Sequence, residues 1–253
     1  MNEIKTMHLF AGVGGGILAD LILGHKPVVA VEWDKYACRV LRERVADGWF
    51  DGMSVWEGDV QMFDPSEYEG RVDCIHAGFP CQDISAVGHQ AGIGEDSRSG
   101  LYREVLRIAD EVRPKYLFLE NVAAIVNGAN GEWLRTVISD LASRGYDAVW
   151  ICLSAAEVGA IHKRDRWWLL AYPMRFNGRG RKESQQSERK ASGQSAGDIC
   201  WWQTESNVGR MAHGIPSASH RLKGLGNAQV PLQAATAFQL LWEIKNDKNT
   251  TAE

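Results

Sequence analysis

Apolar runs alternate with amphipathic stretches along the first 172 residues of the chain. Short runs rich in large and β-branched apolar residues predict buried strands at residues 6–10, 28–31, 55–60, 72–77 and 115–120. Between them, apolar residues recur at helical spacing and predict helices at residues 17–23, 36–45, 96–112 and 133–143. Two further apolar runs, residues 146–153 and 164–171, predict the last two strands, and the final one can run antiparallel. Strands that alternate with helices in this way predict an α/β fold with a doubly wound, mostly parallel sheet.

The sequence changes character after residue 172. Residues 177–198 are rich in glycine, serine, glutamine and charged residues, which predicts a loop or a disordered insert. Ordered character returns at residues 201–216, and residues 231–244 predict a helix that is followed by a polar, frayed tail. We therefore divide the chain into a main domain, residues 1–172 with 222–253, and a small region, residues 173–221.

Charge is distributed unevenly along the chain. The 253 residues carry a net charge of −4, but residues 160–223 carry +7 and the rest of the chain carries −11. A basic stretch on an acidic body is the electrostatic pattern of a protein that contacts a phosphate backbone. A solvated charged loop would have the same composition and is the alternative.

Cysteine usage and hydropathy indicate the compartment. The five cysteines are odd in number and include no Cys-x-x-Cys pair, which predicts a reducing cytosol and no structural zinc. No apolar run reaches membrane-spanning length, and the start of the chain lacks the pattern of a secretory signal. We therefore expect a cytoplasmic protein without a membrane partner and without a bound metal.

A glycine-rich turn follows the first predicted strand. The sequence Ala11-Gly12-Val13-Gly14-Gly15-Gly16 lies between a strand and a helix, where glycines let the backbone approach a nucleotide cofactor closely. The turn does not match the dinucleotide pattern, which requires glycine at the position of Ile17. Glu32 ends the next strand twenty residues after Gly12, within reach of ribose hydroxyls, and Trp33 can stack on a purine. A helix-capping acid and a core tryptophan are the alternatives for these two residues.

Cys81 follows a predicted buried strand on a stiff turn. Gly78 lets the chain leave the sheet, and Pro80 fixes its own backbone angle and keeps Phe79 out of helical space. The thiol is therefore presented at the carboxyl end of a strand, where open α/β sheets place their chemistry. A buried structural cysteine is the alternative. The glycine-rich residues 86–99 predict a loop that closes over a substrate, and a disordered connector is the alternative.

Two further polar groups lie at the ends of apolar strands. Glu120 ends an unbroken apolar run, so ordinary surface charge does not explain it. Arg164 and Arg166 precede another apolar run and share one face of a strand. A thiol, an acid and a guanidinium at strand ends form a set that can hold and attack a heterocyclic base.

These stretches together resemble the cytosine-C5 DNA methyltransferases of bacteria and phages. The resemblance lies in four motifs, in order and spacing: Pro80-Cys81-Gln82, Glu120-Asn121-Val122, Arg164-Asp165-Arg166 and Gly226-Asn227-Ala228-Gln229-Val230-Pro231. It covers nearly the whole chain except residues 174–198. It implies a Rossmann-like methyltransferase fold in which residues 173–221 form a small target-recognition region. One departure is His162, where glutamine is frequent in the family, and we expect it to alter contacts near the site without loss of activity.

The resemblance also implies roles for individual residues. Cys81 is the expected nucleophile, Glu120 stabilises the ring at cytosine N3, and Arg166 holds the O2 edge. Arg164 braces the site or contacts phosphate. For S-adenosyl-L-methionine, Glu32 is expected to bind the ribose, Trp33 to flank the adenine and Asp59 to bind the adenine amino group. The other residues expected at this cofactor are Phe10, Gly12, Gly14, Gly15, Pro80, Leu101, Asn227 and Val230.

The expected function is methyl transfer from S-adenosyl-L-methionine to C5 of a cytosine that is flipped out of a specific duplex DNA site. The resemblance implies a monomer in the cytoplasm of a prokaryotic cell or a phage-infected host. Three alternatives stay open: a relative that methylates cytosine in transfer RNA, a nicotinamide-dependent dehydrogenase, and a catalytically silent DNA-binding relative. The dehydrogenase would leave Cys81, Glu120 and Arg166 without a joint purpose, and the silent relative is disfavoured because no catalytic position is missing.

Overall fold

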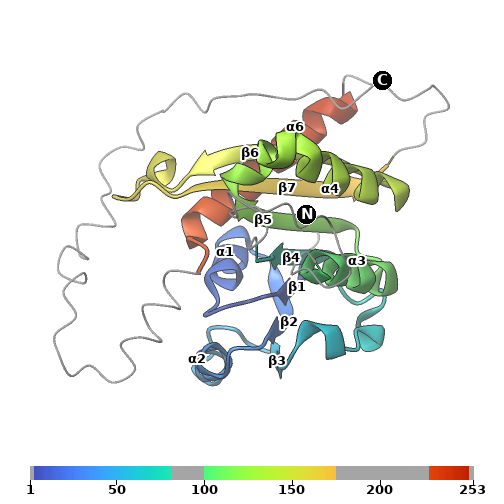
Figure 1. Ribbon diagram of the computed structural model, residues 1–253. Coiled ribbons are helices and arrows are strands. Elements are labelled where there is room, and N and C mark those ends of the chain that lie inside the picture. The colour runs from blue at the N-terminus through green and yellow to red at the C-terminus, as the bar shows by residue number, and fades with distance from the viewer. Residues whose placement is uncertain (1–2, 81–99, 175–227, 251–253) are drawn as a thin grey trace.

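The computed structural model describes residues 3–80, 100–174 and 228–250 of the chain (Figure 1). The strands are β1 (Lys5–Leu9), β2 (Lys26–Glu32), β3 (Ser54–Glu57), β4 (Cys74–Gly78), β5 (Tyr116–Val122), β6 (Tyr146–Ser154) and β7 (Asp165–Pro173). Within the described residues they form one seven-stranded sheet with the order β3-β2-β1-β4-β5-β7-β6. This arrangement confirms the predicted α/β fold with a doubly wound, mostly parallel sheet.

The directions of the strands define where a ligand can bind. Strands β1 to β5 pair in parallel, whereas β7 is antiparallel to both β5 and β6. The antiparallel direction of the final strand agrees with the prediction. The chain winds outward from β1 to β2 and β3 and then crosses to β4, on the other side of β1. Strand order therefore reverses at β1, and open α/β sheets bind ligands beyond the carboxyl ends of the strands at such a point.

Helices cover both faces of the sheet. They are α1 (Gly15–Leu23), α2 (Lys35–Ala46), α3 (Gly100–Val112), α4 (Glu132–Ser143) and α6 (Pro231–Thr250). Helices α1, α2 and α6 pack on one face, and α3 and α4 pack on the other. In Figure 1, α4 and α6 lie on opposite sides of β6 and β7. None of the described helices is both long and apolar enough to cross a lipid bilayer.

Alternate residues of β5 and β7 point to opposite faces of the sheet. Leu119 and Trp167 belong to the apolar core beneath α3 and α4, whereas Phe118 and Trp168 belong to the core beneath α1 and α6. The rings of Phe118 and Trp168 stack with their centroids 5.2 Å apart, and both tryptophans are fully buried. Strands buried on both faces form continuous apolar runs, which is why the sequence pattern identified them.

The described elements differ from the prediction mainly at α6. The sequence predicts a helix over residues 231–244 and then a frayed tail, but α6 continues to Thr250, so this part of the prediction is wrong. One reason is that Lys245 packs on aromatic side chains. Its ammonium group lies 3.7 Å from the centre of the Trp242 ring and 5.2 Å from that of Tyr116. The aromatic rings thus bind both the ammonium group and the aliphatic part of Lys245, and the sequence pattern did not predict these contacts.

Two predicted regions lie outside the described residues. One is the loop predicted at residues 86–99, and the other is the small region at residues 173–221, of which only the first two residues are described. The division of the chain into a main domain and a target-recognition region therefore stays a prediction.

A close contact between α1 and the segment before α6 requires glycine at position 15. A Cβ atom on Gly15 would collide with the backbone carbonyl of Gln229. Gly15→Ala is therefore expected to lower the free energy of unfolding by about 1–3 kcal/mol, which denaturant unfolding measures. Gly100→Ala is the matched control, because no described atom lies within 4 Å of a Cβ atom there and alanine favours a helix. Equal stability of the two variants would contradict this account.

Candidate active site

Four chain segments meet at one edge of the sheet because of the strand directions. The parallel strands β1, β4 and β5 place their carboxyl ends there, and the antiparallel β7 brings its amino end to the same edge. These ends carry the glycine loop after β1, Gly78, Glu120 and Arg166. A pocket at this edge is lined by residues of the glycine loop together with Gly78, Glu120 and Gln229. The sheet thus brings together groups that are far apart in the sequence.

The carboxylate of Glu120 forms an ion pair with Arg166. The Arg166 Nε atom lies 2.8 Å from Glu120 Oε1, and the two side chains are only 19% and 13% exposed, respectively. Trp168 pairs with Glu120 across β5 and β7, and Arg166 lies two residues before it, so both polar side chains project from the same face. Burial raises the pKa of the Glu120 carboxyl, and the positive charge of Arg166 reverses only part of this shift. Glu120 can therefore hold a proton at a higher pH than an ordinary glutamate.

Gln229 contacts Glu120 from the segment before α6, although the sequence analysis gave it no role of its own. Its Nε2 atom donates a hydrogen bond of 3.5 Å to Glu120 Oε2. A Cβ atom on Gly78 would lie 2.8 Å from both groups, so glycine at position 78 leaves the space in which they meet. Gln229 and Glu120 are 109 positions apart in the sequence. Only the motif at residues 226–231, which resembles a motif of the methyltransferases, indicated that Gln229 lies near the site.

Arg164 ties the segment before α6 to the sheet. Its Nη2 atom donates a hydrogen bond of 2.9 Å to the carbonyl of Ala228, next to Gln229. Burial lowers the pKa of its guanidinium group, and the nearby charge of Arg166 acts in the same direction. The resemblance suggests that Arg164 either stabilises the site or contacts a phosphate. The hydrogen bond to Ala228 fits the stabilising role, and a phosphate contact stays a prediction.

Glu32 ties the glycine loop to the end of β2. The Gly12 N–H donates to Glu32 Oε2 at 2.7 Å, and the N–H groups of Trp33 and Asp34 donate to Oε1 at 2.9 and 2.8 Å. Phe10 has a φ of +58°, a left-handed conformation that is uncommon for a bulky residue, at the turn out of β1. A carboxylate has about four lone-pair positions, so Glu32 keeps the capacity to accept a bond from a ribose hydroxyl.

The residues expected at the adenine differ in how well their surroundings fit that role. Trp33 is 73% exposed, so the core-tryptophan alternative is wrong and its ring is accessible for stacking. Asp59 is exposed and accepts a hydrogen bond of 3.1 Å from the N–H of Gln61, as a turn aspartate does. Adenine binding by Asp59 stays a prediction.

Leu101 and Val230 occupy packing positions. Leu101 lies at the start of α3 and packs against the core, whereas Val230 is buried against Ala155 and Ala160. Gly14 has a positive φ of 96° and lies against the side chains of α2 and the turn after it. Contacts of these three residues with a cofactor stay predictions.

The chain that leads to Cys81 is fixed up to Pro80, and Cys81 itself lies outside the described residues, as does Asn227. The Nδ2 atom of Asn121 donates a hydrogen bond of 3.1 Å to the carbonyl of Phe79, whose ring packs on Tyr102. Asn121 follows Glu120 directly on β5. The bond therefore ties the approach to the predicted nucleophile to the strand that carries the acid.

Comparison with known proteins identifies the family. The sequence matches the family model of the C-5 cytosine-specific DNA methylases over residues 4–212. The chain belongs to this family. The match confirms the resemblance and rules out the dehydrogenase alternative; it includes the first three motifs, whereas residues 226–231 lie outside the matched range. The buried acid, the paired arginine and the glycine loop described above are thus parts of a cytosine-C5 DNA methylase.

Relatives of this methylase come from a virus and from bacteria. It is 36% identical over 169 residues to the type II methyltransferase M.CviJI of Paramecium bursaria Chlorella virus IL3A. The aligned residues make up 67% of this chain and 43% of the relative. It is 33% identical over 172 residues to the type II methyltransferase M.HhaI of Haemophilus parahaemolyticus. The aligned residues make up 68% of this chain and 50% of the relative. The methylase chain therefore matches half or less of the length of these relatives.

Solved structures agree with the fold of this methylase. A protein described as a DNA modification methyltransferase, encoded within a prophage of E. coli, superposes with a TM-score of 0.52 at 25% identity. The superposition covers 68% of this chain and 47% of that chain. The S. pombe Dnmt2 methyltransferase superposes with the same TM-score at 18% identity, over 71% of this chain and 51% of its own, which supports the fold alone.

Proposed function

We propose that this DNA methylase transfers a methyl group from S-adenosyl-L-methionine to C5 of cytosine in duplex DNA, with Cys81 as the nucleophile. The observation that carries the proposal is the buried pair of Glu120 and Arg166. Glu120 of this pair lines the same pocket as the glycine loop and lies on β5, whose Asn121 fixes the approach to Cys81. An acid with a raised pKa next to a guanidinium group, at the end of a turn that presents a thiol, suits the activation of a ring.

Cytosine C5 is a poor nucleophile, so the ring must be activated before it can accept a methyl group. In the proposed reaction the thiolate of Cys81 adds to C6, which forms an S–C6 bond and moves an electron pair toward C5. After C5 has taken the methyl group, a base removes the C5 proton and the S–C6 bond breaks by elimination. Cys81 thereby returns to its starting state.

Glu120 and Arg166 are proposed to stabilise the charge that this addition places on the ring. A protonated Glu120 donates to cytosine N3, where negative charge develops, and its raised pKa lets it keep that proton to a higher pH than an ordinary glutamate. Arg166 has further N–H donors beyond the Nε that contacts Glu120, and we propose that they hold the O2 edge. Gln229 and Arg164 keep this pair in place through Glu120 Oε2 and the Ala228 carbonyl.

The residues of the glycine loop and the end of β2 fit an adenosine-containing methyl donor. The exposed Trp33 ring offers a stacking surface, and Glu32 accepts from Gly12 while keeping capacity for a ribose hydroxyl. When bound, S-adenosyl-L-methionine supplies a methyl group activated by its sulfonium. The protein's part is to orient the donor against C5 and to exclude water from the reacting atoms.

The proposed DNA substrate rests on the family and on charge. A cytosine inside a stacked duplex cannot reach these strand ends, so the base must be flipped out, which costs roughly a few kcal/mol. The net charge of +7 over residues 160–223 can offset part of this through contacts with phosphates. No observation on the described residues favours a transfer RNA substrate over DNA.

Methyl incorporation tests this proposal directly. The purified chain is incubated with S-adenosyl-L-methionine labelled in the methyl group, together with either duplex DNA or transfer RNA. We expect label in DNA, and bisulfite sequencing of DNA from expressing cells should show protected cytosines within one short sequence. Incorporation of label into transfer RNA and not into DNA would contradict the proposed DNA substrate.

Replacing Glu32 tests the proposed cofactor site. Glu32→Ala is expected to weaken binding of S-adenosyl-L-methionine by about 1–3 kcal/mol, roughly 5- to 150-fold in Kd, because it removes an acceptor for the ribose and loosens Gly12. Isothermal titration calorimetry measures the change. Glu57→Ala is the matched control, because Glu57 pairs in register with Glu32 on β3 but is bound to Arg42 at 2.6 Å. An unchanged affinity in the Glu32 variant would remove the glycine loop from the cofactor site.

A further inference from the structure

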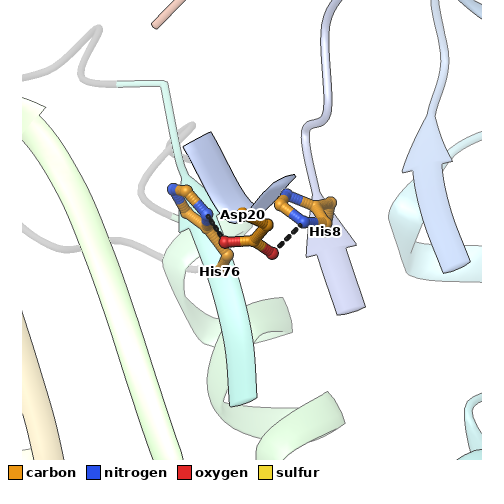
Figure 2. Close-up of side chains that lie close together, drawn as sticks. All are labelled: His8, Asp20 and His76. Atoms are coloured by element: carbon orange, nitrogen blue, oxygen red, sulfur yellow. Dashed lines mark hydrogen bonds and ion pairs between the residues drawn. The ribbon is translucent and has the colours of Figure 1, made fainter. Parts of the chain in front are cut away.

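A second cluster of polar side chains lies in the core, beneath the glycine loop. Figure 2 shows that His8 of β1, Asp20 of α1 and His76 of β4 point toward one another. The Nε2 atom of His8 lies 2.8 Å from Asp20 Oδ2, and the Nδ1 atom of His76 lies 3.8 Å from Asp20 Oδ1. All three side chains are at most 4% exposed. The proposed methyl transfer uses none of them.

The charge of Asp20 must be compensated inside the protein. Asp20 is buried, and nitrogen atoms of His8, His25 and His76 lie 2.8, 3.4 and 3.8 Å from its carboxylate oxygens. A buried carboxylate needs a positive partner or several hydrogen-bond donors.

His76 is the member of the cluster with unused bonding capacity. Neither of its ring nitrogens forms a hydrogen bond with any described residue, although the residue is only 2% exposed. Leaving such a buried group unsatisfied costs about 1–3 kcal/mol. Its Nδ1 atom faces Oδ1 of the Asp20 carboxylate without the geometry of a hydrogen bond, whereas His8 contacts Oδ2 of the same carboxylate.

We propose that His8, Asp20 and His76 form a binding site for a divalent transition-metal ion of the zinc class. One donor atom from each residue lies within 4.8 Å of the donor atoms of the other two. Ligands bound to one zinc ion lie about 2.0–2.2 Å from it, so the three donor atoms would have to move closer together around a common ion. Two imidazoles and one carboxylate, without a thiolate, form a donor set that suits zinc and its neighbours in the first transition series.

The position of the site gives the ion a route of entry. His8 and His76 line the same pocket as Gly12 and Glu120. Three protein ligands leave a coordination position for water. A bound ion would join β1, α1 and β4, which are the three elements that hold the glycine loop. The inference revises the sequence prediction of a protein without metal, which rested on cysteine spacing alone.

Metal titration of the complete chain, made without a polyhistidine tag, tests the site. After treatment with a chelator, the protein is titrated with Zn²⁺ or Co²⁺. We expect one equivalent to bind, a visible absorption spectrum of protein-bound Co²⁺, and a higher melting temperature in the presence of Zn²⁺. X-ray absorption of the zinc form should show nitrogen and oxygen ligands, with scattering from imidazole rings. Absence of stoichiometric binding, or the presence of sulfur ligands, would overturn the proposal.

Variants assign the ligands, and the measurement does not depend on methyl transfer. Asp20→Asn and His76→Gln are each expected to weaken Zn²⁺ binding by roughly 100-fold or more, because even groups that only support ligands contribute about 10- to 100-fold. His162→Gln is the control, because His162 is exposed and lies outside the cluster, and its affinity should stay at the wild-type value. Wild-type affinity in folded Asp20→Asn or His76→Gln protein would rule the site out. If both variants fail to fold, the X-ray absorption of the wild-type protein still decides.

Discussion

Replacing Glu120 by glutamine is expected to lower kcat for DNA methylation by roughly 100- to 10,000-fold, the usual range for loss of an acid that acts in the transition state. Glutamine keeps the size of the side chain but cannot give a proton to cytosine N3. Steady-state kinetics with a defined duplex measures the change. DNA affinity should change far less than kcat, because the interaction strengthens only as charge develops on the ring.

The pH dependence of methylation activity tests the role of Glu120 in a second way. Burial raises the pKa of Glu120, so its protonated form persists to a higher pH than that of an exposed glutamate. Activity that needs this proton should therefore decline as pH rises through the raised pKa, and the Glu120→Gln variant should lack that decline.

A matched control separates the chemistry of Glu120 from the loss of an ion pair. Glu104 lies 2.7 Å from Arg107 on α3, a pair of similar length outside the pocket. Glu104→Gln should leave kcat within about twofold of the wild-type value, because this pair lies outside the pocket. If both glutamate variants reduced kcat equally, or neither did, Glu120 would lose its proposed role.

Replacing Cys81 by serine is expected to lower methyl transfer by at least about a thousandfold, because no described residue that lines the pocket carries a thiol that could form the bond to C6. The other described cysteines are poor substitutes. Burial raises the pKa of Cys38 to about 11 and also raises the pKa of Cys74. Partial burial together with the negative charges of Asp165 and Glu157 raises the pKa of Cys152, so all three are protonated thiols at neutral pH. Cys152→Ser is the control, because this thiol is exposed on β6 and should not affect turnover.

A trapped adduct identifies the nucleophile independently of the rate. In DNA that contains 5-fluorocytosine at the target, the proton that must leave C5 is absent, so the S–C6 bond should persist under denaturing conditions. Peptide mapping should find the adduct on Cys81. An adduct on Cys200 or on one of the other three cysteines would overturn the assignment.

The sequence predicted the parts of the fold that follow from local patterns. Strands buried on both faces, such as β5 with Leu117, Phe118 and Leu119, form apolar runs that no exposed segment would contain. The polar groups of the proposed site were found because Glu120 interrupts such a run and Arg166 precedes another. These signals lie within a few residues, so a single sequence reveals them.

Contacts between distant segments could not be predicted in the same way. Gln229 reaches Glu120 only because α6 returns against α1, and its amide has no periodic pattern around it. His8, Asp20 and His76 are each embedded in an apolar stretch, and they meet only because β1 and β4 are neighbours and α1 packs on them. A search for closely spaced metal ligands therefore misses this cluster. Side-chain partners that depend on three elements become visible only when the elements are in place.

The antiparallel direction of β7 has a consequence for how this protein can diverge. Strand β7 begins at the pocket and ends nine residues later at the opposite edge of the sheet, about 30 Å away, where the Met174 N–H donates to the carbonyl of Gly145. The chain is next described at Ala228, whose carbonyl is bound by Arg164 back at the pocket. Both attachment points are thus held by the sheet, and the more than fifty residues between them exceed the length needed to join the points. We therefore expect insertions, deletions or exchanges within that stretch to leave strand register and the acid–guanidinium pair unchanged, and if the stretch holds the predicted target-recognition region, new DNA targets would not require new chemistry.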